Sequence, residues 1–499
     1  MKIDVIRKLP DHMDTIVVLQ TQSGDMKNFE YLPTDILDSI KVYIKDENYQ
    51  FSYNSICTFH YMNHKHNSKV ILCGAGEKDK LNADKVRTLC ANITRTALKH
   101  KSSVMYMFMG FDMPINDVVF GHVVSEGCLL ALYKFSKYLS DDKPKTIEAL
   151  HIVIDTKNTR HLNRGIMEGR IYSEATILAR NLVNEPANVI NPESLSEAAK
   201  KTALNYGFSI EIFTYDKIKR LKMDAYLSVA RGSKYEPRLI IMRYNGNPDN
   251  KTDVVGLIGK GLTYDSGGYC IKTAQGMVNM KNDMGGSAAV IGAMAAISTL
   301  KLKVNVVGII AACENMISGD AYRPGDIVRS MAGKTIEVIN TDAEGRMTLI
   351  DAIHYGIDRE HITKVIDIAT LTGAAVAALG TSFSAVMTND DSLLEQLQQA
   401  ADFSGENIWQ LPTHLDYLDL IKSEVADLKN VGGPYAGAIT AGLFIREFVE
   451  DKPWLHIDIA GTALKDKENG IYSYGGTGVG VRLLTGLVRN LEKELNKEV

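Results

Sequence analysis

The chain has 499 residues, enough for two or more domains, and 45% of them are hydrophobic, an ordinary share for a globular protein. A formal net charge of −4 excludes a general electrostatic attraction to nucleic acid or to an anionic membrane. The first 160 residues alternate strand-like and helix-like patterns, which is typical of a parallel or mixed sheet. We expect strands at 14–20, 69–73, 103–109 and 147–154, helices at 83–99 and 118–138, and a polar surface loop at 140–145.

A long helical pattern follows over residues 163–182 and ends near Pro186, because proline cannot continue a helix. We therefore expect an N-terminal α/β domain at 1–160, a linking helix at 161–186 and a C-terminal α/β domain at 187–499. Apolar runs in the C-terminal domain predict strands at 210–213, 238–243, 254–258, 304–311, 335–339, 365–369, 384–387 and 455–459. Helical patterns lie between many of them, and the last helix begins near Gly478. The predicted fold class is α/β, with a mixed or parallel sheet flanked by helices in each of the two domains.

Cysteine usage and the first residues both indicate a cytoplasmic protein. The six cysteines show no CxxC or CxxH spacing, which favours reduced thiols in a chain of this length. Residues 1–10 lack the apolar segment of a signal peptide. We also expect no stretch long and apolar enough to span a bilayer.

Residues 340–346 read Asn-Thr-Asp-Ala-Glu-Gly-Arg and carry the most informative chemistry in the chain. Two carboxylates, Asp342 and Glu344, stand two residues apart on an expected turn between a strand and a helical stretch. Two anions held so close repel each other unless a cation lies between them. The motif therefore predicts a metal site whose other ligands lie elsewhere in the chain.

A second block, at 256–286, supplies further candidate ligands. Lys260 is expected at the carboxyl end of a buried strand, the edge at which open α/β sheets bind ligands. Asp265 precedes a glycine pair that lets the backbone turn back, and Asp283 precedes a helical stretch. The shared cluster that we expect at these loop ends consists of Lys260, Asp265, Asp283, Asp342 and Glu344.

This cluster is rich in carboxylates and contains no thiolate or histidine. Carboxylates suit Mg²⁺ and Mn²⁺, and Zn²⁺ also accepts them. Four carboxylates carry more charge than one divalent ion balances, and with one of them bridging they fit two ions. Lys260 can ligate only as a neutral amine, so the neighbouring cations would have to lower its pKa far below the usual value.

The two blocks resemble the signatures of the leucyl aminopeptidase family, dinuclear metallo-aminopeptidases that are also called cytosol aminopeptidase or aminopeptidase A. Residues 340–346 match the most diagnostic motif of that family without a break. Further similar landmarks lie at 181–188, 229–238, 426–430 and 456–461. The resemblance is strong over residues 165–490 and only general over the first 150.

Mapped residue by residue, the resemblance implies two divalent ions, Zn²⁺ or Mn²⁺, with Mg²⁺ or Co²⁺ as further options at the exchangeable site. The tighter ion would be held by Lys260, Asp265, Asp283 and Glu344, and the exchangeable ion by Asp265, Asp342 and Glu344. A water or hydroxide that bridges the ions would attack the scissile carbonyl. Lys272 resembles the catalytic lysine that donates to the developing oxyanion, and Arg346 resembles the arginine that anchors a bicarbonate acting as general base.

The hydrophobic substrate pocket of the family is matched at five positions, Met280, Thr370, Leu371, Gly373 and Ala460. The resemblance thus implies removal of leucine-like N-terminal residues from peptides, by an enzyme assembled as a homohexamer. Departures from the commonest family pattern, such as Tyr264 and Thr273, touch no ligand position.

Other interpretations stay open at this point. Some bacterial relatives of the family also act as DNA-binding regulators, although no basic stripe interleaved with aromatic residues is visible here. A catalytically dead scaffold is disfavoured by the complete ligand set. A serine-protease interpretation of residues 265–268 lacks the flanking glycine and proline and the upstream histidine segment of such enzymes.

Overall fold

The chain divides into two compact units, and each is described by itself. The first comprises Met1–Glu174 and Lys467–Tyr474, and the second Ala175–Asp466 and Gly475–Val499. The computed structural model describes residues 1–22, 24, 29, 32–63, 67–140, 146–154, 158–250 and 252–495. The loop expected at 140–145 therefore lies outside the described residues except for Ser140.

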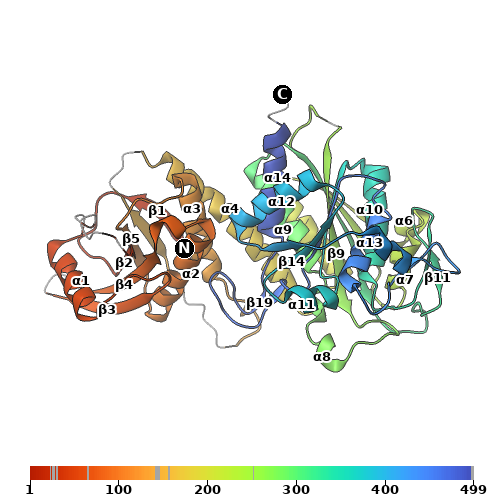
Figure 1. The fold of residues 1–499 in the computed structure, drawn as a ribbon, viewed down its shortest axis with the longest axis horizontal. Coiled ribbons are helices and arrows are strands. Elements are labelled where there is room, and N and C mark those ends of the chain that lie inside the picture. Colours follow the sequence, from red (N-terminus) through yellow and green to blue (C-terminus); the bar gives the residue numbers. More distant parts are fainter. Residues whose placement is uncertain are drawn as a thin grey trace. The chain divides into compact units, whose positions relative to one another are not determined.

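The first unit is a single sheet with helices on both faces (Figure 1). Its strands are β1 (Lys2–Ile6), β2 (Thr15–Thr21), β3 (Ile56–Met62), β4 (Asn67–Gly76), β5 (Val104–Met109) and β6 (Ala149–Val153). Its helices are α1 (Thr34–Asp46), α2 (Ala83–Lys99), α3 (Asp117–Ala131) and the first part of α4 (Arg160–Asn184). The strand order is β1-β6-β5-β2-β4-β3, and β3 pairs antiparallel with β4 while the other pairs are parallel.

Strand β2 is buried on both faces, as expected for the centre of a sheet covered on both sides. Val17 and Leu19 belong to one core cluster with α2 and α3, whereas Ile16 and Val18 belong to another with α1. Within the described residues, the structure adds β1, α1, β3 and a short 3-10 helix at Lys78–Lys80 to the predicted elements, and α3 ends at Ala131 rather than at residue 138.

The second unit is built on an eight-stranded mixed sheet in the order β15-β14-β17-β13-β9-β10-β8-β7. Its strands are β7 (Ser209–Phe213), β8 (Arg238–Asn245), β9 (Val254–Asp265), β10 (Asn305–Asn315), β13 (Lys364–Ala369), β14 (Ser384–Thr388), β15 (Ile408–Gln410) and β17 (Trp454–Asp458). Two small sheets stand apart from it: β11 (Ile327–Arg329), β12 (Thr335–Glu337) and β16 (Leu428–Lys429), and β18 (Leu464–Lys465) with β19 (Gly475–Gly476). The strand expected at 335–339 thus belongs to a small sheet and is shorter than predicted.

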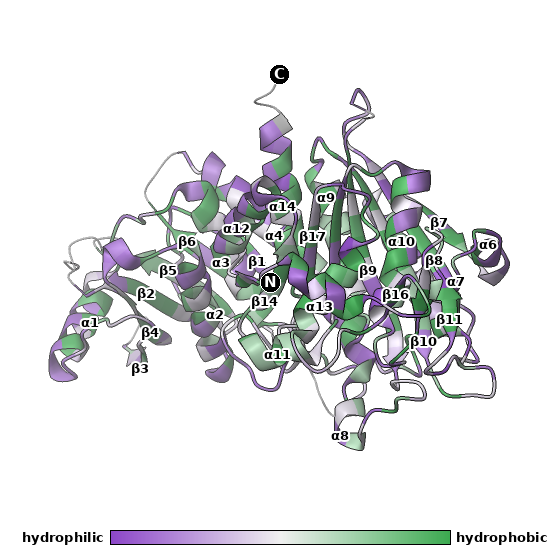
Figure 2. Ribbon diagram, turned by 45° about the vertical axis from the view of Figure 1, so that its right-hand side comes forward, coloured by the Kyte–Doolittle hydropathy of each residue, from purple (hydrophilic) through white to green (hydrophobic). Residues whose placement is uncertain are grey.

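Helices cover both faces of this sheet (Figure 1). One face carries α5 (Pro192–Tyr206), α9 (Gly285–Leu300), α12 (Asp391–Ser404) and α14 (Val481–Leu495), and the other carries α7 (Asp224–Ala230), α10 (Gly345–Glu360) and α13 (Gly437–Arg446). The unit also contains the second part of α4, the short helices α6 (Tyr215–Arg220), α8 (Ala274–Met277) and α11 (Gly373–Leu379), and 3-10 helices at Met280–Asn282 and Leu415–Ile421. Figure 2 shows that α9 and the central strands are hydrophobic, in keeping with their burial.

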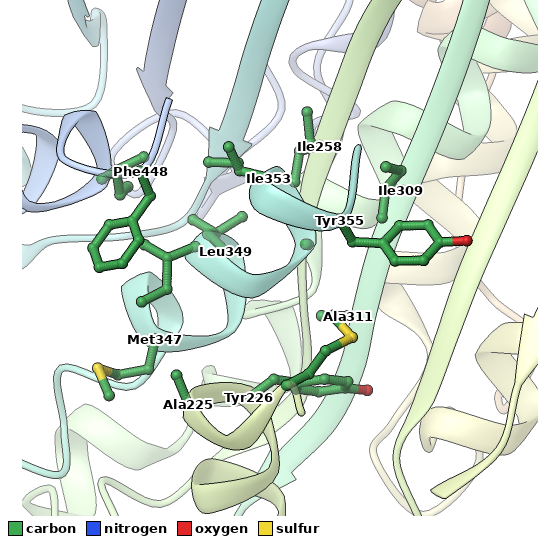
Figure 3. Packing of buried hydrophobic residues seen from close by; sticks show 14 of the residues in the cluster. Ala225, Tyr226, Ile258, Ile309, Ala311, Met347, Leu349, Ile353, Tyr355 and Phe448 are labelled. Carbon is green, nitrogen blue, oxygen red and sulfur yellow. The ribbon is translucent and has the colours of Figure 1, made fainter. Parts of the chain in front are cut away.

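Helix α10 is held to the sheet by its apolar side. Figure 3 shows Ile353 of α10 near Ile258 of β9, and Met347 and Leu349 of α10 and Tyr226 of α7 belong to the same buried cluster. Each large apolar side chain that is fully buried contributes roughly 1.5–3 kcal/mol. This packing fixes the N-terminus of α10 against β9, and the expected metal-binding motif lies at that N-terminus.

One helical stretch is long and apolar enough to cross a membrane by length and composition, which corrects the expectation that no stretch meets this test. It is Ala274–Leu300, which contains α9, and 89% of its apolar window is buried inside the protein. The buried core helix of a globular unit passes the same test, and the packing of α9 against β9 and β13 accounts for its apolar composition.

Candidate metal centre

The expected site residues gather at the carboxyl edge of the eight-stranded sheet, where four neighbouring parallel strands end. Asp265 is the last residue of β9, and Asp458 is the last residue of β17. Lys260, in contrast, lies inside β9 and not at its end, because the ladder with β10 continues to Asp265. A cavity of about 650 Å³ opens there, and its lining includes Lys260, Asp265, Lys272, Met280, Asp283, Asp342, Glu344, Arg346, Thr370, Leu371, Gly373 and Ala460.

The loop after β9 turns back on itself through a glycine pair. Gly267 and Gly268 have φ values of 87° and 62°, a left-handed conformation that glycine adopts without strain. The Lys272 amide then donates to the Ser266 carbonyl oxygen. The Lys272 ammonium nitrogen lies 2.7 Å from Asp265 Oδ2 and 2.5 Å from Asp342 Oδ1.

Lys260 lies among the remaining carboxylates. Its Nζ is 2.8 Å from Asp283 Oδ1 and 2.9 Å from Glu344 Oε1, and it donates to the Thr370 carbonyl oxygen at 3.0 Å. Burial lowers the pKa of Lys260, but attraction to Asp283, Glu344 and Asp265 outweighs burial and raises it. To ligate as a neutral amine, Lys260 would need cations close enough to reverse this balance.

The carboxylates are crowded and largely buried. Asp265, Asp342 and Glu344 each offer an oxygen atom within 4.8 Å of the others. Burial first, and then repulsion from neighbouring carboxylates, raises the pKa of Glu344 to about 8 and that of Asp283 to about 6. The same two causes raise the pKa of Asp342. The fold therefore holds negative charge at a place where it is unfavourable without cations.

The donor set fits divalent metal ions. Within the described part of the chain, Asp283 Oδ2 and Glu344 Oε2 are buried and have no hydrogen-bond partner. A buried carboxylate oxygen without a partner is costly, and a cation would satisfy it. Four carboxylates carry more negative charge than one divalent ion neutralises, and Lys260 would bind as a neutral amine, so the donor set suits a pair of divalent ions.

Arg346 lies on the first turn of α10 and lines the cavity. Its Nη1 donates to the Asn430 carbonyl oxygen at 2.7 Å, and its Nε has no hydrogen-bond partner among the residues that the structure describes. Burial lowers the pKa of Arg346 to about 10, against the opposing effect of Glu344 and Asp458. At neutral pH the guanidinium thus remains a cation with a donor available for an anion.

The five residues expected in the substrate pocket, Met280, Thr370, Leu371, Gly373 and Ala460, line this same cavity. Asp458 holds part of this wall in place. Its Oδ1 accepts the Leu371 and Ala460 amides at 3.1 and 3.0 Å, and its Oδ2 accepts the Thr372 hydroxyl at 2.7 Å. The strand expected at 455–459 includes Asp458, but strand prediction does not reveal these contacts.

Sequence reasoning missed the residues that brace the ligand loops. Asn430 accepts the Ile339 and Asn340 amides and donates to the Asn340 carbonyl oxygen at 2.6 Å. Asn315, at the end of β10, donates to Asp265 Oδ1 and to the Thr341 carbonyl oxygen. Asn315 could have been found from its place a few residues after the strand expected at 304–311, because polar residues that follow a strand lie at the carboxyl edge of the sheet, where ligands bind.

Comparison with known proteins gives matches over both units. Residues 177–485 match the model of the cytosol aminopeptidase family catalytic domain, and residues 17–142 match the model of the N-terminal domain of that family. A probable cytosol aminopeptidase from Clostridium perfringens is 46% identical over 459 residues, which cover 90% of this chain and 92% of that protein.

Two solved structures are similar over nearly the whole chain. A mutant of tomato leucine aminopeptidase is 32% identical with a TM-score of 0.87, covering 98% of this chain and 96% of its own. A bottromycin maturation enzyme, BotP, in complex with Mn is 29% identical with a TM-score of 0.85, covering 96% of this chain and 99% of its own. The fold class expected from the sequence, two α/β domains, is confirmed by these matches.

Proposed function

Because the chain belongs to the cytosol aminopeptidase family, and is thus a metal-dependent aminopeptidase, we propose that it removes leucine and similar apolar residues from the N-termini of peptides. The observation that carries the proposal is the convergence of four carboxylates and two lysines in one cavity, with two buried carboxylate oxygens that lack hydrogen-bond partners.

In this proposal two divalent ions occupy the cavity. The tighter one is held by Lys260, Asp265, Asp283 and Glu344, and the exchangeable one by Asp265, Asp342 and Glu344. Zn²⁺ and Mn²⁺ are the expected ions, with Mg²⁺ or Co²⁺ as options at the exchangeable site. When bound, such a pair polarises a carbonyl and makes a hydroxide nucleophile available near neutral pH.

Two cationic side chains complete the proposed chemistry. Lys272 is the donor for the oxyanion, because its ammonium group reaches into the carboxylate cluster. Burial lowers the pKa of Lys272, but attraction to Asp265 and Glu344 outweighs burial and raises it, so the group stays protonated. Arg346 holds an anion at its unpaired Nε, and we assign that anion as bicarbonate, which would accept a proton during the reaction.

The apolar preference follows from the cavity wall. Met280 and Leu371 supply apolar surface, while Gly373 and Ala460 leave space for a branched side chain. We further propose that the chain assembles as a homohexamer in the cytoplasm. The proposed domains are 1–160 and 187–499, joined by a linking helix at 161–186. A DNA-binding role gains no support from the comparisons, whose names are those of aminopeptidases and a maturation enzyme.

The deciding experiment pairs metal analysis of the purified protein with a panel of aminoacyl fluorogenic amides. We expect about two divalent ions per chain. Activity should be highest on leucyl and similar amides, disappear after chelation and return with Mn²⁺ or Zn²⁺. Equal activity before and after complete metal removal would refute the proposed chemistry, whereas preference for a charged side chain would refute only the proposed pocket.

A further inference from the structure

We propose that Asn315 is a positioning residue of the metal centre, whose side-chain amide orients Asp265 and the Thr341–Asp342 peptide so that both carboxylates serve the ions. The inference rests on the proposed function, since it assigns a role toward the same site. It adds a residue that is not itself part of the cavity lining and that acts through two proposed ligands.

An irregularity in the sheet brings Asn315 beside Asp265. Along the parallel ladder of β9 and β10, Cys313 pairs with Leu262 but Glu314 pairs with Tyr264. Thr263 is therefore an extra residue in β9, and this bulge sets Asn315 opposite Asp265. Bulges beside active sites commonly re-aim a side chain in this way.

Chemistry fixes which end of the amide faces the ligands. The Asn315 nitrogen Nδ2 donates to Asp265 Oδ1 at 2.8 Å and to the Thr341 carbonyl oxygen at 2.9 Å. Both partners are acceptors, so the opposite orientation would set oxygen against oxygen. The Asn315 oxygen instead faces Gly268, where a Cβ would come within 2.9 Å of it.

The two hydrogen bonds remove freedom from both ligand loops. Asp265 Oδ1 also accepts the Gly267 amide at 2.9 Å, which leaves Oδ2 as the oxygen turned toward Lys272. The Thr341 carbonyl oxygen also accepts the Tyr322 hydroxyl at 2.8 Å, so two donors fix the peptide that leads into Asp342. Asn315, Tyr322 and Thr341 are fully or almost fully buried, so water cannot substitute for a lost donor.

This arrangement predicts an effect on metal affinity and not merely on stability. Partners that orient metal ligands typically change metal affinity or activity by about 10–100-fold when they are removed. Asp265 is assigned to both ions, but the exchangeable ion has three proposed ligands and the tighter ion has four. An Asp265 carboxylate that is free to rotate would therefore weaken the exchangeable site more. The peptide pocket lies on other segments, and binding of the peptide side chain should change little.

The test compares Asn315→Asp, Tyr322→Phe and Asn305→Asp with the wild-type chain. Asn315→Asp turns the shared donor into an acceptor at nearly constant volume, and Tyr322→Phe removes only the second donor to Thr341. Asn305 is a matched control, because it lies at the other end of β10 and donates to the carbonyl oxygens of Asn247 and Asn250. Mn²⁺ and Zn²⁺ affinities are measured by competition with a chelating dye, alongside Tm, kcat and KM.

We expect Asn315→Asp to weaken Mn²⁺ affinity by about 10–100-fold and to shift the Mn²⁺ concentration for half-maximal activity equally, with KM unchanged at saturating Mn²⁺. Asn305→Asp should lower Tm and leave Mn²⁺ affinity as in the wild type. Equal Tm losses in both variants with wild-type Mn²⁺ affinity would overturn the inference.

If Asn315→Asp does not fold, Tyr322→Phe decides, because a weaker Mn²⁺ affinity supports the inference and a wild-type affinity overturns it. A wild-type chain that binds neither Mn²⁺ nor Zn²⁺ would overturn the proposed function as well, so the two failures are distinguishable.

Discussion

The Cα of Gly345 lies directly against the side-chain stem of Lys260. A Cβ built at Gly345 would stand 2.4 Å from Lys260 Cε and 2.7 Å from its Nζ, far inside contact distance. The first residue of α10 and the middle of β9 thus approach as closely as a glycine allows. This contact helps to fix the position of the Lys260 ammonium nitrogen between the carboxylates of Asp283 and Glu344.

Gly345→Ala is therefore expected to impair the site, although alanine is the better helix former. The added methyl group must displace the Lys260 side chain, and a misplacement of about 1 Å can cost about 10²-fold in rate. We expect a fall of that order in kcat/KM for a leucyl amide, together with weaker metal retention on dialysis. Gly319→Ala is the control, since no described atom lies within 4 Å of a Cβ there, and it should behave as the wild type. Full activity in Gly345→Ala would contradict the prediction.

Replacing Lys272 by glutamine should separate catalysis from substrate binding. Loss of one preorganised donor to a developing oxyanion typically lowers kcat by about 10²–10³-fold. We expect that loss with little change in KM or in metal content, measured by steady-state kinetics and metal analysis. Lys281→Gln is the matched control on the same segment, because the Lys281 ammonium donates to the Asn184 carbonyl oxygen and does not line the cavity. An unchanged kcat in Lys272→Gln would show that the oxyanion is stabilised by other groups.

Substitution of Gly373 by valine should shift the side-chain preference. No described atom lies within 4 Å of a Cβ at Gly373, so a side chain can begin there without a clash, and the methyl groups of valine would take up space in the cavity. A change of one or two methylene groups in a substrate pocket typically changes the ratio of kcat/KM values for two substrates by about 10-fold or more. We expect the ratio of kcat/KM for leucyl over alanyl amides to fall by about that factor. The alanyl amide serves as the internal control, and an unchanged ratio would place the leucine side chain elsewhere.

Asp351 should make the stability of the second unit depend on pH. It is buried in α10 and accepts the Tyr226 and Met331 amides, and burial outweighs these bonds to raise its pKa to about 7. In the unfolded chain an aspartate titrates near 4, so between about pH 4 and 7 the unfolded state releases a proton that the folded state retains. The contribution of Asp351 to stability is therefore complete below pH 4 and declines as pH rises toward 7.

The measurement is Tm against pH from 5 to 8 for the wild type and for Asp351→Asn. The variant should be less stable at pH 5, because an amide cannot accept both backbone donors, and its Tm should depend less on pH in this range. Asp358→Asn is the control, because Asp358 lies on the same helix but is exposed and paired with Arg359 at 2.8 Å. Identical pH slopes in the wild type and Asp351→Asn would refute the assignment.

The chemistry of the site could be read from the chain because its ligands stand in two short motifs at the ends of recognisable strands. Carboxylates two residues apart at 342 and 344, and lysines near Asp265, predict a charge cluster whatever the path of the backbone between them. The helix at 83–99 and the long helical pattern around 163–182 were equally readable, since apolar spacing over many residues outweighs local exceptions.

Other features required the tertiary structure. Residues 259–261, Gly-Lys-Gly, have little intrinsic preference for a strand, so β9 was expected to stop at Ile258; pairing with β10 carries it on to Asp265. Helix α3 ends at Ala131, and the Tyr133 carbonyl oxygen just beyond it accepts the hydroxyl of Ser473, a residue 340 positions away.

The chain itself thus determined which charged groups carry the chemistry, because their type and spacing are local properties. Which groups hold them in register was decided by contacts between distant segments, such as the bulge that sets Asn315 opposite Asp265 and the close approach of Gly345 to Lys260. Packing sets the separation of such segments to within a few tenths of an ångström, and no local sequence pattern encodes that separation.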